Sequence, residues 1–157
     1  MDDVETTKKA ALRLLSFRPR SENELKKRLA QKKLPAPAID EVMAWLRKEG
    51  WVDDEKFARL YALSRMQSGA FGKGRVRREL TQRGLTGPLI QTGMAAIRDI
   101  DEFDAALELA QKRLVSMHGV SRDAKKRRLQ GLLLRRGFSA ETTYKVLSKL
   151  VGEVEVD

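Results

Sequence analysis

The sequence repeats itself at an interval of about fifty residues, and this periodicity limits the fold more than any other feature. A shift of 51 residues places segment 24–46 on 75–97, and a further shift of 53 places the second copy on the C-terminal third of the chain. The apolar positions that align are Leu25, Val76 and Leu129; Leu29, Leu80 and Leu133; Leu34, Leu85 and Phe138; and Leu46, Ile97 and Leu150. "KKL", "RGL" and "RGF" mark the same turn in each copy. Such a chain has to stack small units of one kind on each other.

Each copy has the spacing of amphipathic helices. Leu25 and Leu29 lie four residues apart, and Ile39, Val42 and Leu46 follow one helical stripe. Helix-breaking residues separate the second and third helices of each copy: prolines in the first, glycines and a proline in the second, and Gly137 with Ser139 in the third. A further helix precedes each pair, at about 8–17, 54–67 and 101–117. Strand signals are absent. We therefore expect an all-α fold of three tandem three-helix repeats in an elongated, curved array, with repeats at 1–53, 54–100 and 101–150 and a flexible acidic tail at 151–157.

Composition narrows the class of protein. The chain has 32 lysines and arginines against 22 acidic residues, a net charge of +10, and no cysteine. The basic surplus indicates a polyanionic partner, either nucleic acid or the acidic face of another protein. The lack of cysteine excludes disulfides and thiolate metal sites, and fits a reducing compartment. Short apolar runs and an N-terminus without an apolar segment predict no membrane span and no secretory signal, so we expect a cytoplasmic protein.

The residues give little support for catalysis. His118 is the only histidine, and it has no cysteine, second histidine or evident serine partner. The segment "GAFGKGR" (69–75) lacks the spacing of a phosphate loop and the Ser or Thr that should follow Lys73. It is better read as a flexible connector before a helix starting near Arg75, although its backbone amides could approach phosphates. We expect no enzyme activity, no cofactor and no metal site.

The stretch "EGWVDDEKFA" (49–58) places adjacent carboxylates in a basic protein. Asp53 is predicted to cap the helix that follows it, with Asp54 and Glu55 in the first turn where the helix dipole favours negative charge. The pattern recurs at Ile100–Asp101, which favours capping over metal binding or acid–base chemistry. Trp51 is expected to pack inside the fold rather than to anchor a partner. Core positions are also predicted for other aromatic residues: Trp45, Phe57, Tyr61, Phe138 and Tyr144.

Basic residues gather on or beside the middle helix of each repeat. Lys32, Arg83 and Arg136 occupy one register position near helix C-termini, where the helix dipole accounts for a cation. Arg75 to Arg78 and Arg122 to Arg128 lie near helix starts, where the helix dipole disfavours a cation and so does not explain them. We expect a continuous basic stripe that binds a partner or DNA, although a charge run can also be only a solvated face. The predicted binding residues are Lys26, Lys27, Lys73, Arg75, Arg77, Arg78, Arg122, Lys125, Lys126, Arg127 and Arg128.

Three segments together resemble the RecX family of bacterial recombination regulators: "RSENELKKRLAQKKL" (20–34), "IDEVMAWLRKEGWVDDEKFARLYALSR" (39–65) and "GKGRVRRELTQRGL" (72–85). The resemblance covers residues 10 to 150 and is weakest in the third repeat. It implies three tandem three-helix repeats. It also implies a monomeric regulator, active in DNA repair and the SOS response, that binds the RecA recombinase in the groove of its filament on DNA. Such a regulator suppresses ATP hydrolysis, coprotease activity and strand exchange.

A second interpretation is a stand-alone nucleic-acid-binding protein of the helix–turn–helix kind, without a recombinase partner. The last two helices of each repeat suit a helix–turn–helix, and "SAETTYKVL" (139–147) could be a recognition helix that offers Thr142, Thr143 and Lys145 to a groove. Its apolar residues argue for a partly buried helix instead. The aromatic residues are not interleaved with the basic ones as base-stacking surfaces require, so any DNA contact should be weak and independent of sequence.

Overall fold

The computed structural model describes residues 2–152, and its helices follow the predicted repeat. The first repeat contains α1 (Asp3–Phe17), α2 (Glu22–Gln31) and α3 (Ala36–Lys48), the second α4 (Asp54–Gln67), α5 (Lys73–Gln82) and α6 (Gly87–Ala96), and the third α7 (Phe103–Val115), α8 (Arg122–Arg135) and α9 (Ala140–Val151). No strand occurs within these residues. The all-α fold of tandem three-helix repeats is thus confirmed. The predicted boundaries at residues 53 and 100 stay predictions, and the acidic residues of the predicted tail, 153–157, lie outside the described part.

The described residues divide into two compact units. One comprises the chain up to Leu60 together with Leu80–Gly93, and the other comprises Tyr61–Glu79 together with the chain from Met94 onward. The middle repeat therefore contributes to both units, whereas the first and third repeats each belong to one.

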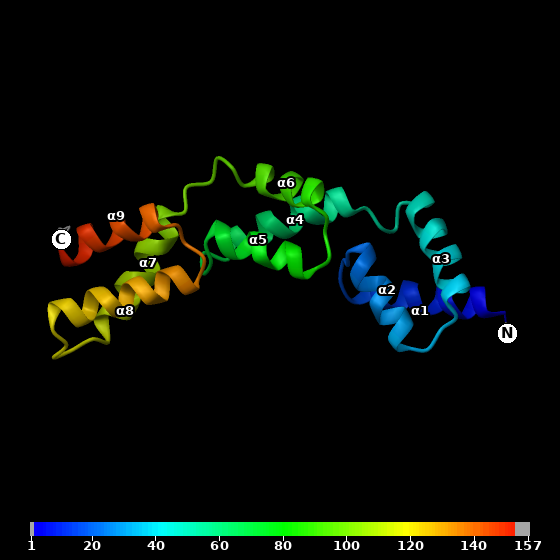
Figure 1. Ribbon diagram of the computed structural model, residues 1–157, viewed down its shortest axis with the longest axis horizontal. Helices are drawn as coiled ribbons and strands as arrows, with labels where there is room; N and C mark the ends of the chain where they lie inside the picture. The colour runs from blue at the N-terminus through cyan, green and yellow to red at the C-terminus, as the bar shows by residue number, and fades with distance from the viewer. Residues whose placement is uncertain (1, 153–157) are drawn as a thin grey trace. The chain divides into compact units, whose positions relative to one another are not determined.

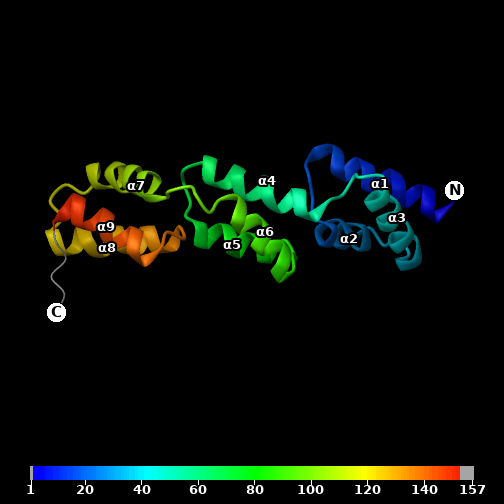
Figure 2. The ribbon, with the colours of Figure 1, turned by 90° about the horizontal axis from the view of Figure 1, so that it is seen from above.

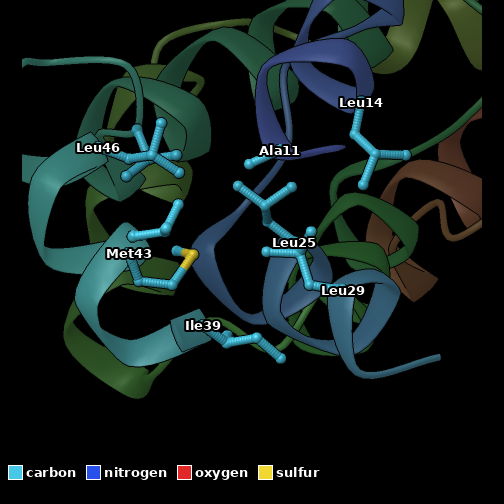
Figure 3. Close-up of a cluster of buried hydrophobic side chains, with 9 residues drawn as sticks. Ala11, Leu14, Leu25, Leu29, Ile39, Met43 and Leu46 are labelled. Atoms are coloured by element: carbon cyan, nitrogen blue, oxygen red, sulfur yellow. The ribbon is translucent and has the colours of Figure 1, made fainter. Parts of the chain in front are cut away.

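The core of the first repeat forms where α1, α2 and α3 meet. Figure 3 shows side chains from the three helices converging, with Leu25 and Leu29 of α2 facing Met43 of α3. All three are fully buried. Serine fixes the start of α2 in a capping box, in which the Ser21 hydroxyl accepts from the Glu24 amide and the Glu24 carboxylate accepts from the Ser21 amide. The helical spacing seen in the sequence is thus the spacing of this core.

The third repeat has an equivalent core. Helices α7, α8 and α9 contact one another in pairs, as Figures 1 and 2 show. Leu129 and Leu133, which align with Leu25 and Leu29, are fully buried together with Val146 of α9. Ser121 and Ser139 cap α8 and α9 by accepting from backbone amides three residues further on.

The turn after each middle helix has the same unusual backbone in every repeat. Lys33, Gly84 and Gly137 have φ angles of 62°, 79° and 87°, in the left-handed region. These residues align under the shifts of 51 and 53. Glycine adopts this conformation without a steric penalty and lysine does not. The repeat is therefore preserved in backbone geometry even where the residue type differs.

In each of the two aligned acidic pairs, Asp53–Asp54 and Asp101–Glu102, the two side chains accept hydrogen bonds from two different helices. Asp53 accepts from the Lys56 amide (3.1 Å), as the capping prediction requires. Asp101 accepts from the Phe103 amide (2.9 Å), the first amide of α7, but the N-cap residue of α7 is Glu102, so the equivalent position is shifted by one residue. The second acid of each pair reaches back to the middle helix of the preceding repeat. Asp54 accepts from the amide of Glu22 (2.9 Å), and Glu102 accepts from the amide of Lys73 (2.9 Å). Both acceptors hold the first amide of α2 or α5, so the pairs fasten successive repeats together.

Two aromatic predictions are wrong. Trp51 is 57% exposed, because its neighbour Val52 takes the place facing the core. Tyr144 is 48% exposed, because α9 turns Thr143, Val146 and Leu147 inward and leaves Tyr144 on another face. Phe57 and Phe138 are buried as predicted, and Trp45 and Tyr61 are half-buried.

Among the helices between residues 2 and 152, none has the length and hydropathy of a transmembrane segment.

Candidate functional site

The basic residues of α2 face outward. Lys26 and Lys27 are exposed, while Leu25 and Leu29 on the opposite face fill the core. Among residues 2–152, no hydrogen bond or ion pair engages either ammonium group. Both cations are therefore available to an anionic partner.

The basic residues of α5 divide into two groups. Lys73 is half-buried, and its Nζ donates to the Arg98 carbonyl (3.0 Å). Arg75 is half-buried and pairs with Glu79 (3.2 Å). Arg78 is exposed and makes a long contact to the Arg135 carbonyl (3.5 Å), and Arg77 is also exposed. Lys73 and Arg75 are thus bonded within the fold, so the basic residues of α5 do not all face outward as a continuous stripe would require.

Glu79 is the centre of a charged network on α4 and α5. It accepts two hydrogen bonds from Arg65 (both 2.8 Å) and one from the Tyr61 hydroxyl (2.8 Å). The guanidinium groups of Arg65 and Arg75 also lie 4.1 and 4.2 Å from the centre of the Phe71 ring. Burial raises the pKa of Glu79, but the hydrogen bonds from Arg65, Tyr61 and Arg75 outweigh it and hold that pKa below its ordinary value.

The cations of α8 are mostly turned away from the core. Arg122 donates from Nε to the carbonyl of Val151 (2.6 Å), so it holds the end of α9. Lys125 and Lys126 are half-buried. Arg127 and Arg128 are exposed, in the middle of the helix.

The glycine-rich connector is not a phosphate cradle. The Gly72 amide donates to the Arg136 carbonyl (2.8 Å), the Gly74 amide donates to the Gly137 carbonyl (3.0 Å), and Glu102 takes the amide between them. The helix begins at Lys73, close to the predicted start. Because the amides of Gly72, Lys73 and Gly74 are already bonded within the fold, these three are not free to approach phosphates.

The possible recognition helix is poorly placed for DNA. Thr142 donates its hydroxyl to Glu102 (3.1 Å), and Thr143 is buried. Lys145 is exposed and pairs with Glu141 at 3.0 Å, one turn away on the same helix. Two of the three side chains proposed to read a groove therefore serve the fold.

An apolar groove in the first unit escaped sequence reasoning. It has a volume of about 530 Å³ and is lined by α1, α4 and the segment between α3 and α4, with Trp51 and Leu60 among its exposed walls. Local pattern could not find it, because its walls come from residues far apart in the chain.

The single histidine, His118, is exposed in the turn between α7 and α8. No group of three or more acidic or histidine side chains within the described residues is arranged to hold a metal ion.

Comparison with known proteins relates this chain to one family over all its repeats. The first, second and third three-helix domains of RecX match residues 8–46, 53–94 and 99–147. The chain is 32% identical over 148 residues to Regulatory protein RecX of Thermobifida fusca, covering 93% of this chain and 80% of the relative. It is 29% identical over 152 residues to Regulatory protein RecX of Streptomyces coelicolor, covering 97% and 81%.

A solved structure shares the fold. The crystal structure of RecX from Lactobacillus salivarius superposes with a TM-score of 0.82 at 21% identity, covering 95% of this chain and 97% of that chain. The repeated helices, the domain matches and the identity to relatives over most of their length lead to one conclusion: the chain is a member of the RecX family.

Proposed function

We propose that this chain is a regulatory protein that binds the RecA recombinase filament on DNA and inhibits its ATP hydrolysis, coprotease activity and strand exchange, and so modulates recombination and DNA repair. The observation that carries the proposal is the match of a RecX domain to each of the three repeats. The relatives named above carry the name of a regulatory protein. A chain that presents one unit three times suits a partner that is itself a repeating polymer.

Inhibition follows from thermodynamic linkage. A recombinase that hydrolyses ATP passes through more than one arrangement of its subunits. A protein that binds one arrangement more tightly than the others raises its population and slows the cycle. Such a regulator needs no catalytic group of its own, only contacts that differ between the arrangements.

The outward cations are the proposed contacts with the filament. Lys26 and Lys27 on α2, Arg77 on α5, and Arg127 and Arg128 on α8 are exposed on the middle helices. Their charge suits the phosphates of DNA or acidic patches of the recombinase. Any direct DNA contact is proposed to be independent of base sequence, since the candidate recognition threonines are engaged within the fold.

ATP hydrolysis by RecA on single-stranded DNA tests the proposal. Adding this chain should inhibit hydrolysis at concentrations far below those that coat the DNA. Inhibition that appears only when free DNA is saturated would mean competition for DNA, and would favour a stand-alone DNA-binding protein. No inhibition at any concentration would exclude the proposed regulator.

A matched pair of variants tests the cations. Lys26→Glu with Lys27→Glu should move the inhibitory concentration upward, while the helical circular dichroism stays unchanged. Lys9→Glu with Lys48→Glu makes the same charge change at exposed positions on α1 and α3, outside the middle helices. This control should inhibit like the parent chain. Equal weakening in both variants would assign the effect to net charge alone.

A further inference from the structure

Four arginines surround a cleft on the third repeat. Arg113 comes from the last turn of α7, and Arg127, Arg128 and Arg135 come from α8, which packs beside it (Figure 1). The cleft has a volume of about 340 Å³, and its lining includes Met117 and Leu132, which are buried. Of these four arginines, only Arg127 and Arg128 are among the binding residues predicted from the sequence, since nothing local brings Arg113 to the same place.

Folding alone does not account for this cluster. No acidic residue lines the cleft, and none of the four guanidinium groups forms an ion pair within residues 2–152. The dipoles of α7 and α8 favour cations at their C-terminal ends and so explain Arg113 and Arg135, but Arg127 and Arg128 lie in the middle of a 14-residue helix. Like charges that face one cleft repel each other, which an anion in the cleft would relieve.

The arginines of α4 and α5 give a comparison within the same unit. There Arg65 and Arg75 also lie close together, and the chain supplies Glu79 between them. The cleft between α7 and α8 is lined by four arginines and lacks such a carboxylate among the described residues. A negative partner for these arginines would therefore come from outside that part of the chain.

The chemistry of the cleft suits a phosphate group. Each guanidinium offers a planar fork of donors that pairs with two oxygens at once, and phosphate presents its oxygens in a tetrahedral arrangement that forks from several directions can share. A carboxylate has only two oxygens in one plane and cannot satisfy four forks. The volume lies at the small end of ligand sites, which span about 300–1,000 Å³. The apolar side chains of Met117 and Leu132 leave room for the organic part of an ester.

We propose that the cleft lined by Arg113, Arg127, Arg128 and Arg135 is a binding site for the phosphate group of a phosphate ester. This inference deepens the proposed function, because Arg127 and Arg128 are also among the proposed contacts with the filament, but it is tested on the cleft between α7 and α8 without the recombinase. The phosphate can belong to a free nucleotide or to the backbone of a polynucleotide, and the two sources differ in what else they require of the surface.

Binding of three probes to the full chain tests the site: pyrophosphate and ATP by calorimetry, and a labelled oligothymidylate by fluorescence anisotropy. Arg113→Gln with Arg128→Gln removes one arginine from each helix at exposed positions, so the fold should persist. Arg13→Gln with Arg59→Gln removes the same charge from exposed positions on α1 and α4 and serves as the control. The cleft variant should lose at least about tenfold in affinity, as expected when charge-assisted hydrogen bonds to an anion are removed, and the control less than about twofold.

The outcomes separate the sources. Loss of ATP and pyrophosphate binding in the cleft variant identifies a nucleotide site. Loss confined to the oligothymidylate, with neither small probe bound by the parent chain, identifies a polynucleotide backbone site. Equal loss in the two variants overturns the proposal, because diffuse charge then explains binding. Displacement of the probes by polyglutamate as readily as by pyrophosphate also overturns it, in favour of an acidic protein surface.

Discussion

At the scale of single residues, the acidic pairs show that two adjacent side chains can bind backbone amides of two different helices. Asp53 caps its own helix and Asp54 holds the first amide of α2. Burial raises the pKa of Asp54, the Glu22 amide opposes that rise, and the charges of Glu22 and Asp53 add to it. Asp54 therefore contributes stability at low pH that is lost as the pH rises through its folded pKa. Asp54, which the sequence alone could suggest as part of a metal or acid–base site, instead connects two successive repeats.

Replacing Asp53 by alanine should lower the free energy of unfolding by about 0.5–2 kcal/mol, because the amide of Lys56 loses its acceptor. Urea denaturation followed by circular dichroism measures the loss. Asp40→Ala removes an exposed acid from the interior of α3 and should change stability by less than about 0.5 kcal/mol. Equal effects at the two positions would show that Asp53 has no capping role.

At the scale of helices, α4 and α5 are joined by one carboxylate. Replacing Glu79 by glutamine should cost about 1–3 kcal/mol at neutral pH, because Arg65 and Arg75 lose a charged partner. Since the pKa of Glu79 is lowered in the fold, its contribution is present above the unfolded value, about 4.3, and disappears as the pH falls through the folded value.

The difference between the parent chain and Glu79→Gln should therefore narrow steadily below about pH 4.3. Urea unfolding at a series of pH values measures this difference. A gap that stays constant down to pH 2 would mean that the negative charge of Glu79 contributes nothing to the link between the helices.

The turn after α8 provides a second test at this scale. Gly137 has a left-handed backbone, and a Cβ there would collide with the backbone and side chain of Arg75 at the start of α5. Gly119 shares the left-handed backbone, but a Cβ there would meet open space. Both alanine variants carry the conformational penalty of about 1–2 kcal/mol.

Gly137→Ala should therefore lose about 1–3 kcal/mol more than Gly119→Ala, because it also displaces a neighbouring helix. Thermal or urea unfolding of the two variants isolates that extra loss. Similar stabilities would mean that the contact between Gly137 and α5 is not maintained in solution.

The helices themselves could be predicted because their information is local. Apolar spacing located the core residues, and the aligned turn marked Lys33, Gly84 and Gly137 before their backbone was known. The failures concern choices between adjacent residues. Either Trp51 or Val52 could have faced the core, and nothing in the pattern shows that the smaller side chain does so. Tyr144 failed in the same way, since its place on α9 depends on the face that packs against α7 and α8.

At the scale of the whole molecule, the candidate binding residues were only partly predictable. A count of charges located the basic helices, but it could not separate Lys26 and Lys27, which are exposed, from Lys73 and Arg75, which are used inside the fold. That distinction depends on acceptors such as Glu79 that tertiary packing brings close. The arginine cleft was missed for the same reason, because Arg113 reaches it from another helix.

The central claim is that this chain acts on a recombinase filament rather than on DNA alone. The most direct measurement compares its affinity for single-stranded DNA with its affinity for the same DNA coated by RecA and held with a non-hydrolysable ATP analogue, at one salt concentration. We predict binding to the filament at least about tenfold tighter than to naked DNA, a difference of about 1.4 kcal/mol. Equal or weaker binding to the filament would contradict the claim and assign the basic helices to nucleic acid alone.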